Sequence, residues 1–261
     1  MEKILKLMGA GIMRNAIGLI PTRLNSRRLP RKSLKMIGNL PLIIHTYKRA
    51  KLSKKLKEVF ICCDSKEVYN IANKFGANVI ITSKKHKCGT DRISEAFKKV
   101  KGNYDQIINI QGDEPLIDPK NIDKVINFHR KNLEYDIVLP NLITKFTKDP
   151  HVVRLIFNKK KEVIYITRSE APNQFIKKTD KIFKHLSIVS FKPSALKKYS
   201  SSKQSGLELI EDIELLRAIE NGMCLGSNKI NSDSFSVDVI NDYRKAKMYL
   251  KKDKIKKKYK N

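Results

Sequence analysis

Residues Gly18–Leu34 read GLIPTRLNSRRLPRKSL, a basic stretch that follows the apolar run Ala16–Ile20. An apolar run that meets Pro21 has the pattern of a short buried strand that ends in a loop. The loop carries five cations with small or hydroxyl side chains between them: Arg23, Arg27, Arg28, Arg31 and Lys32. Open α/β sheets bind ligands at the carboxyl ends of their strands, and guanidinium groups pair with phosphate oxygens. The stretch therefore predicts a phosphate-binding loop. The alternative is a solvated basic loop, against which the stiffness of Pro21 and Pro30 counts.

The next segments alternate between strand and helix patterns. Pro41–Ala50 reads as an amphipathic helix, Val59–Asp64 as a buried strand, Ser65–Phe75 as a helix that Gly76 ends, and Asn78–Thr82 as a third strand. Such β-α-β alternation at intervals of ~20–30 residues is typical of a parallel sheet with helices on both faces. The sequence therefore predicts the α/β fold class.

Two further loops carry polar groups to the same predicted edge of the sheet. Ser83–Glu95 contains His86 and Arg92, with Thr90 as the expected N-cap of a helix whose first amides are free to meet a ligand. The strand Ile107–Ile110 ends in Gln111-Gly112-Asp113-Glu114-Pro115. Mg²⁺ takes one or two protein carboxylates together with phosphate oxygens, which suits Asp113. An ordinary turn or helix cap is the alternative for this acidic strand end.

Composition limits the classes of function. The formal net charge is +29, but lysine is scattered along the chain without aromatic platforms, so nucleic-acid binding is not the expected role. No tract of ~18 apolar residues is present, so we expect no membrane span. Residues 1–12 lack signal-peptide features and are expected to be an N-terminal extension. The four cysteines show no metal-ligand spacing, which suits reduced thiols in the cytoplasm.

The second half of the chain has a different pattern. Val152–Phe157 and Glu162–Thr167 read as strands about a turn, and His185–Phe191 as another strand. Leu207–Glu220 reads as one helix on which Glu208, Glu211 and Glu214 share a face, and Phe235–Asp238 as a short strand that ends in an acid.

Several of these segments resemble a known family. The pattern P-x-R-x-x-S-x-R-L-P-x-K-x-L from Pro21 to Leu34, HxxGTDR at residues 86–92 and QGDEP at residues 111–115 are similar to the sugar-acid cytidylyltransferases, in particular the 3-deoxy-manno-octulosonate cytidylyltransferase family. The resemblance runs from Ile17 to Asp238. It implies a Rossmann-like nucleotidyltransferase sheet with a smaller inserted β-rich lobe for sugar binding and dimerisation. The expected single domain spans residues 13–261, with a nucleotide-binding part at about 13–143 and 211–250 and a sugar-acid lobe at about 144–210.

The resemblance also implies roles for individual residues. The implied nucleotide-binding residues are Pro21, Thr22, Arg23, Arg28, Lys32, Gly89, Thr90, Arg92 and Gln111. The implied catalytic residues are Arg23, Lys32 and Asp113, the implied Mg²⁺ ligands are Asp113 and Asp238, and the implied sugar-binding residues are Arg168, His185, Glu208 and Glu211.

The implied reaction transfers CMP from CTP to a 3-deoxy-2-ulosonic acid, with 3-deoxy-manno-octulosonate as the first candidate, and releases pyrophosphate for lipopolysaccharide or other surface glycan synthesis. A homodimer is implied as well. Alternatives are a different sugar acid or a relative that binds nucleotide or nucleic acid without turnover. The chain departs from the family pattern at Arg31, His151, Arg154, Val189 and Leu215. If Val189 and Leu215 line the sugar pocket, we expect weak use of the usual octulosonate, improved by Leu215→Gln.

Overall fold

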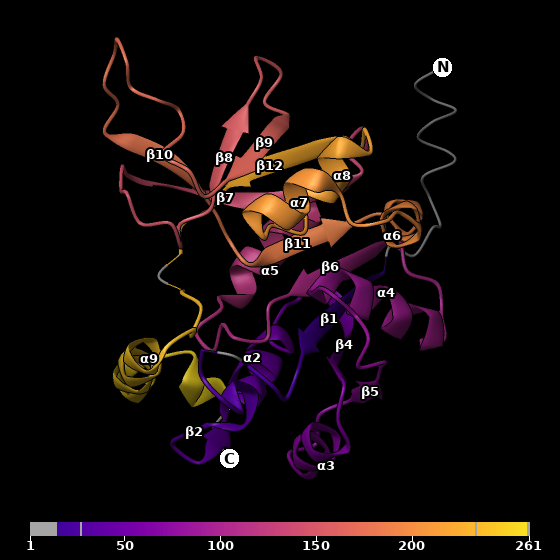
Figure 1. Cartoon of the computed structure of the whole chain (residues 1–261). Coiled ribbons are helices and arrows are strands. Elements are labelled where there is room, and N and C mark those ends of the chain that lie inside the picture. Colours follow the sequence, from indigo (N-terminus) through magenta and orange to yellow (C-terminus); the bar gives the residue numbers. More distant parts are fainter. Residues whose placement is uncertain (1–14, 27, 233, 260–261) are drawn as a thin grey trace.

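The computed structural model describes residues 15–26, 28–232 and 234–259. Arg27 and the predicted extension 1–12 lie outside these ranges. The centre of the structure is a ten-stranded sheet in the order β5-β4-β1-β6-β11-β7-β10-β8-β9, with β12 also paired to β7. Its strands are β1 (Ala16–Thr22), β4 (Leu56–Cys63), β5 (Val79–Ile81), β6 (Gln106–Ile110), β7 (Ile137–Lys145), β8 (Arg154–Phe157), β9 (Val163–Thr167), β10 (Lys181–His185), β11 (Ile188–Phe191) and β12 (Leu225–Lys229). Strands β5, β4, β1 and β6 are parallel, so the predicted α/β class is confirmed (Figure 1).

Helices cover both faces of this sheet. They are α2 (Leu42–Ala50), α3 (Lys66–Lys74), α4 (Gly89–Lys99), α5 (Pro119–Lys131), α6 (Pro193–Ser201), α7 (Gly206–Glu211), α8 (Leu216–Glu220) and α9 (Ile240–Lys252). Side chains along β1 alternate between the faces. Ile20 packs in one core cluster with residues of α2, α3 and α5, whereas Ile17 and Leu19 pack in another with α4, α6 and α8.

Short 3₁₀ helices and one hairpin flank the larger helices and strands. The 3₁₀ helix η1 (Lys32–Leu34) follows the basic loop, the hairpin β2 (Met36–Ile37) and β3 (Leu40–Pro41) precedes α2, and the 3₁₀ helix η2 (Lys256–Lys258) follows α9. No helix in the described ranges has the length and apolar character needed to cross a bilayer.

The predicted β-rich lobe continues the central sheet. Strands β8, β9 and β10 extend it beyond β7, in the upper part of Figure 1. Strand β11 falls within the predicted lobe at residues 144–210, yet it lies between β6 and β7 in the middle of the sheet. The division into a nucleotide part and a sugar-acid lobe therefore stays a prediction, and the hydrogen-bonded sheet is shared between them.

Three predicted elements are wrong in detail. The strand predicted at His185–Phe191 is two strands, because the pairing changes at Leu186–Ser187: β10 pairs with β7 and β8, whereas β11 pairs with β6 and β7. The helix predicted at Leu207–Glu220 is broken into α7 and α8 by Asp212, whose φ of 51° is left-handed. The three glutamates on it therefore do not share one helical face. The segment Phe235–Asp238, predicted as a strand, forms no strand.

Candidate active site

Two carboxylates and a lysine meet at the carboxyl ends of the parallel strands. The Nζ atom of Lys32 lies 2.8 Å from Oδ2 of Asp113 and 3.1 Å from Oδ1 of Asp238. Arg28 adds a second cation, with Nη2 2.9 Å from the same Asp238 oxygen. Residues from three distant parts of the sequence are thus brought together, as the resemblance implies for Arg28, Lys32, Asp113 and Asp238.

Asp238 reaches this position through backbone and side-chain hydrogen bonds. The Val237 amide donates to the carbonyl oxygen of Asp113 at 2.9 Å, which ties the segment to the end of β6. The carboxylate of Asp242 accepts from the amide of Asp238 at 3.0 Å. Glu114, the second acid of the predicted pair, is buried and accepts from the hydroxyl of Ser234 at 2.6 Å. Burial raises the pKa of Glu114, against the hydrogen bonds that lower it. Glu114 therefore anchors the chain that supplies Asp238 and does not face the cluster.

The charge of the cluster suits a cation between the two carboxylates. Burial alone would lower the pKa of Lys32, but Asp113 and Asp238 outweigh it and the pKa is raised. Both carboxylates therefore converge on one cationic centre already. No group of three or more His, Cys, Asp or Glu side chains with metal-binding geometry occurs in the described ranges. Two carboxylates suffice for Mg²⁺ where phosphate oxygens and water complete the shell, so the donor set fits this ion.

Glycines let the strand ends approach closely at this edge. A Cβ atom at Gly112 would lie 2.8 Å from the carbonyl oxygen of Pro21 and 2.8 Å from Cδ1 of Ile43. One at Gly89 would lie 3.2 Å from Cγ of Pro21 and 3.8 Å from Nε2 of Gln111. The absence of a side chain at Gly112 thus allows the end of β6 to approach β1 and α2, and Pro21, Gly89 and Gln111 line one edge. Pro21 belongs to β1 and does not end it, because the strand continues to Thr22.

The loop after β1 contains an arginine whose side chain has no partner among the described residues. The same loop is held by Asp64, an acid that the site predictions did not include. Arg23 is exposed and has no hydrogen bond or ion pair with any described residue, so it can reach a ligand. Asp64 accepts from the Leu24 amide at 3.1 Å and from Nη2 of Arg92 at 3.4 Å. Arg92 is buried and also donates to Thr82 at 2.8 Å. It therefore braces the strand ends. The sequence signal for Asp64 was its place at the end of a predicted strand.

The start of α4 differs from the prediction. Cys88, not Thr90, is the N-cap, and its sulfur accepts from the Asp91 amide at 3.5 Å. The Thr90 amide, predicted to be free for a ligand, donates to Oε2 of Glu214 at 3.0 Å. No local pattern predicts this contact, because Glu214 lies 124 positions further along the chain.

The predicted sugar-binding residues lie around β9, β10 and α7. The Nε atom of Arg168 donates to the backbone carbonyl of Glu211 at 3.0 Å, and the Glu211 carboxylate accepts from the Arg168 amide at 2.9 Å. Burial acts to raise the pKa of Glu211, but hydrogen bonds from Thr167 and Arg168 outweigh it and the pKa is lowered. In His185, Nδ1 is buried and has no hydrogen-bond partner in the described ranges. Burial lowers the pKa of His185 to about 4, so the ring is neutral at pH 7.

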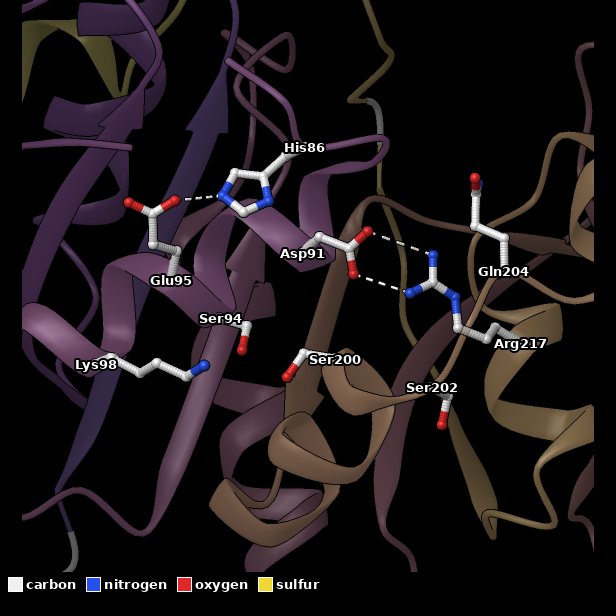
Figure 2. A pocket seen from close by; sticks show the side chains of 9 residues that line it. All are labelled: His86, Asp91, Ser94, Glu95, Lys98, Ser200, Ser202, Gln204 and Arg217. Atoms are coloured by element: carbon white, nitrogen blue, oxygen red, sulfur yellow. Dashed lines mark hydrogen bonds and ion pairs between the residues drawn. The ribbon is translucent and has the colours of Figure 1, made fainter. Parts of the chain in front are cut away.

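Glu208 is held by a buried ion pair and has no free oxygen. Arg217 donates to Glu208 at 2.7 Å and 2.6 Å. Its Nη1 also lies 2.9 Å from Oδ1 of Asp91 on α4, and Figure 2 shows this second pair. Asp91 and Arg217 line a cavity of about 340 Å³ between α4 and α6, together with the pair His86–Glu95. Arg217 therefore joins the helix that begins in the nucleotide loop to the segment predicted to bind sugar.

Four of the five departures from the family pattern have structural explanations, and nothing in the structure explains His151. Val189 and Leu215 are each 3% exposed and pack in the core beneath α4, so the prediction that they line the sugar pocket is wrong. Arg154 is buried and donates to the carbonyls of Arg168 and Ser169, both at 2.7 Å. Arg31 adopts a left-handed φ of 56°, which suits glycine better, and pairs with Glu67 on α3.

Comparison with known proteins gives the family. The cytidylyltransferase family profile matches residues 17–230. The chain is 36% identical over 248 residues to the 3-deoxy-manno-octulosonate cytidylyltransferase of Thermodesulfovibrio yellowstonii, covering 90% of this chain and 97% of that protein. It is 36% identical to the enzyme of the same name from Rickettsia bellii, covering 91% of this chain and 96% of that protein.

Solved structures agree with these sequence relatives. A CMP:2-keto-3-deoxy-manno-octonic acid synthetase complexed with CTP superposes with a TM-score of 0.84 at 28% identity, covering 91% of this chain and 99% of that one. A cytidylyltransferase from Leptospira borgpetersenii shares the fold, with a TM-score of 0.63 at 20% identity, covering 92% of this chain and 88% of that one. The chain therefore belongs to the cytidylyltransferase family and, within it, to the 3-deoxy-manno-octulosonate cytidylyltransferases.

Proposed function

We propose that this protein transfers CMP from CTP to 3-deoxy-manno-octulosonate and releases pyrophosphate. The observation that carries the proposal is the convergence of Lys32, Asp113 and Asp238 at the carboxyl edge of the sheet, in a chain 36% identical to enzymes named for this activity. The C2 hydroxyl oxygen of the sugar acid attacks the α-phosphorus of CTP. The bond from that phosphorus to the bridging oxygen breaks, pyrophosphate leaves with the bonding electrons, and the hydroxyl proton passes to water.

Positioning and charge neutralisation carry such a step without a covalent nucleophile. Asp113 and Asp238 would hold Mg²⁺, which supplies Lewis-acid polarisation of the α-phosphate when bound. Lys32, now paired with both carboxylates, is placed to turn to the phosphates of CTP, and Arg23 is free to meet them. Arg28 is a weaker candidate because it is half exposed and paired with Asp238. The nucleotide is surrounded by Pro21, Thr22, Gly89 and Gln111. Thr90 and Arg92 act indirectly, by holding the loops that surround the nucleotide.

The sugar acid would lie between β10 and α7. The unpartnered Nδ1 atom of His185 supports a hydrogen bond to the substrate, and Arg168 would pair with the substrate carboxylate. Glu211 orients Arg168 through the hydrogen bonds described above. Glu208 acts indirectly and does not bind the sugar acid itself, because both of its carboxylate oxygens already accept hydrogen bonds from Arg217, Gln204 and the Ser205 amide.

A homodimer in the cytoplasm completes the proposal. Phe175 and Ile176, on the loop before β10, are 90% and 93% exposed, and Phe183 on β10 is also exposed. Exposed apolar groups gathered on one segment mark an interaction surface, and a second copy of the chain is the proposed occupant. Light scattering behind gel filtration should show a dimer for the parent and a monomer for Phe175→Glu/Ile176→Glu; a monomeric parent would contradict this part.

The function is tested by pyrophosphate release from CTP with 3-deoxy-manno-octulosonate, an acylneuraminate and a modified octulosonate. Release with the first substrate, and preference for CTP over ATP and GTP, supports the proposal. Turnover with another acid alone would identify a cytidylyltransferase of different specificity. No turnover with any acid would indicate a binding protein, and retention of nucleic acid at ~0.2 M salt would favour a nucleic-acid module. The CMP-sugar product would serve lipopolysaccharide or other surface glycan synthesis.

A further inference from the structure

A second cavity has Lys48 of α2 in its wall and shares no lining residue with the candidate active site. It has a volume of about 260 Å³ and is lined by Asn39, Leu40, Lys48, Lys74, Phe75, Lys256 and Tyr259. These residues come from the β2–β3 hairpin, α2, the end of α3 and η2, which lie near one another in the lower part of Figure 1. None of them belongs to the candidate active site.

The cavity concentrates uncompensated positive charge. Lys48, Lys74 and Lys256 line it, and none of the lining residues is acidic. No side chain of the three lysines has an ion pair or hydrogen bond with any described residue. Asp253, which accepts from the backbone amide of Lys256, is already paired with Arg49. Three ammonium groups around one concave space repel one another unless an anion lies among them.

Part of this arrangement is fixed by packing. Lys256 is half-buried, and its Nζ lies 3.3 Å from the point where Gly38, at a φ of +65°, would carry a Cβ atom. Tyr259, three residues later, is buried, and its hydroxyl lies 3.1 Å from Nδ1 of His45. His45 is neutral, because burial and, to a smaller extent, the charges of Lys256 and Arg49 lower its pKa to about 4. The wall beside Lys256 is therefore preformed.

A chain with a net charge of +29 has many solvated lysines, so charge alone does not mark a site. Here two half-buried lysines and one exposed lysine face the same cavity, whose other walls are Phe75 and Tyr259. We propose that this cavity binds a compact multivalent phosphate anion, with Lys48, Lys74 and Lys256 as its counter-charges. Pyrophosphate and the phosphate chain of a nucleotide share this chemistry.

The site is separate from the transfer machinery. Thr46 donates from its hydroxyl to the carbonyl oxygen of Gly112 at 3.2 Å, next to the candidate metal ligand Asp113. Lys48 is two residues further along α2, so it projects from the opposite side of the helix. Filling the cavity therefore does not require contact with CTP, and removing its charges should leave basal transfer unchanged.

Titration calorimetry with pyrophosphate in EDTA tests the proposal on the full chain. The variant Lys48→Gln/Lys74→Gln/Lys256→Gln should lose at least ~10-fold in affinity, or one bound pyrophosphate per chain. The control Lys101→Gln/Lys160→Gln/Lys197→Gln removes the same charge from exposed lysines elsewhere and should stay within about twofold of the parent. The variant Lys32→Gln, altered in the active site, should keep the site. Equal losses in both triple variants, or parental binding in the pocket variant, would overturn the proposal.

A second measurement needs no variant. Pyrophosphate should slow acetylation of Lys48 and Lys256 in the unaltered protein, read by mass spectrometry, but not that of Lys101 or Lys160. Absence of this protection would refute the site even if the triple variant failed to fold. Inorganic phosphate should protect less than pyrophosphate, and CMP less than CTP; equal protection would exclude a multivalent ligand. These readouts are binding measurements, so they remain informative if the proposed transfer reaction is wrong.

Discussion

Replacing Arg217 with methionine should strongly destabilise the protein. Arg217 and Glu208 are 2% and 4% exposed, and Arg217 also lies 4.3 Å from the centre of the Tyr199 ring. Removing one partner of a buried ion pair leaves the other charge uncompensated, which costs about 3–5 kcal/mol. We expect a loss of this size in the free energy of unfolding at pH 7, measured by urea denaturation.

The loss should depend on pH with a definite sign. In the parent, burial opposes ionisation of Glu208, but Arg217 and other donors outweigh it, so its folded pKa is lowered. This stabilising contribution is present above the unfolded pKa of ~4.3 and is lost as pH falls through the folded pKa. Without Arg217, burial raises the pKa of Glu208, so the buried acid takes up a proton as pH falls. The deficit of Arg217→Met should therefore be smaller at pH 5 than at pH 7.

The matched control is Arg244→Met, which removes the same charge from an exposed position on α9. It should stay within ~0.5 kcal/mol of the parent. If Arg217→Met differs from Arg244→Met by less than ~1 kcal/mol, or if its deficit does not change with pH, the buried pair does not have the energetic role assigned to it.

Three further outcomes are expected. Asp113→Asn should keep the unfolding midpoint but lower pyrophosphate release by at least ~100-fold, because it removes one of two converging carboxylates; near-parental turnover at limiting Mg²⁺ would contradict the metal assignment. Arg31→Gly should unfold with a free energy ~1 kcal/mol above that of Arg31→Ala, since both lose the Glu67 pair and only glycine relieves the left-handed φ of 56°; equal urea midpoints would count against strain there. Leu215→Gln should destabilise by at least ~1–3 kcal/mol without improving turnover, because it buries an amide in the core; a gain in kcat/KM with the octulosonate would restore the pocket interpretation.

The first half of the fold was predictable because its signals are local. Apolar runs that end in Pro21, Asp64 and Gln111 mark three strands of the parallel sheet, and the polar residues after them meet at one edge. The cluster at Lys32 follows from this rule, since loops at the carboxyl ends of parallel strands converge. The position of Asp238 does not follow from this rule, because its segment is held by hydrogen bonds of Glu114 and Val237 and not by a strand.

The remaining elements depend on contacts between distant residues. The spacing of the glutamates predicts one helix, yet the carboxylate of Glu211 binds Thr167 and the Arg168 amide, and α7 ends at this residue. Strand β12 reads LGSNK and has little strand signal of its own. Its pairing with β7 requires a glycine at residue 226, because a Cβ atom there would clash with the ring of Tyr135. Such tertiary determinants override local propensity.

The position of β11 bears on how the chain is made. Strand β6 ends at Ile110, but its second neighbour is not complete until Phe191 has left the ribosome. At ~5–20 residues per second, the roughly 80 intervening residues take about 4–16 seconds to synthesise. During that interval β6 and β7 each lack a partner, and unpaired strands readily join those of other chains. A chain that stops between β7 and β11 therefore exposes unpaired edges of β6 and β7, and a fragment that ends before β11 lacks one of the two neighbours of β6.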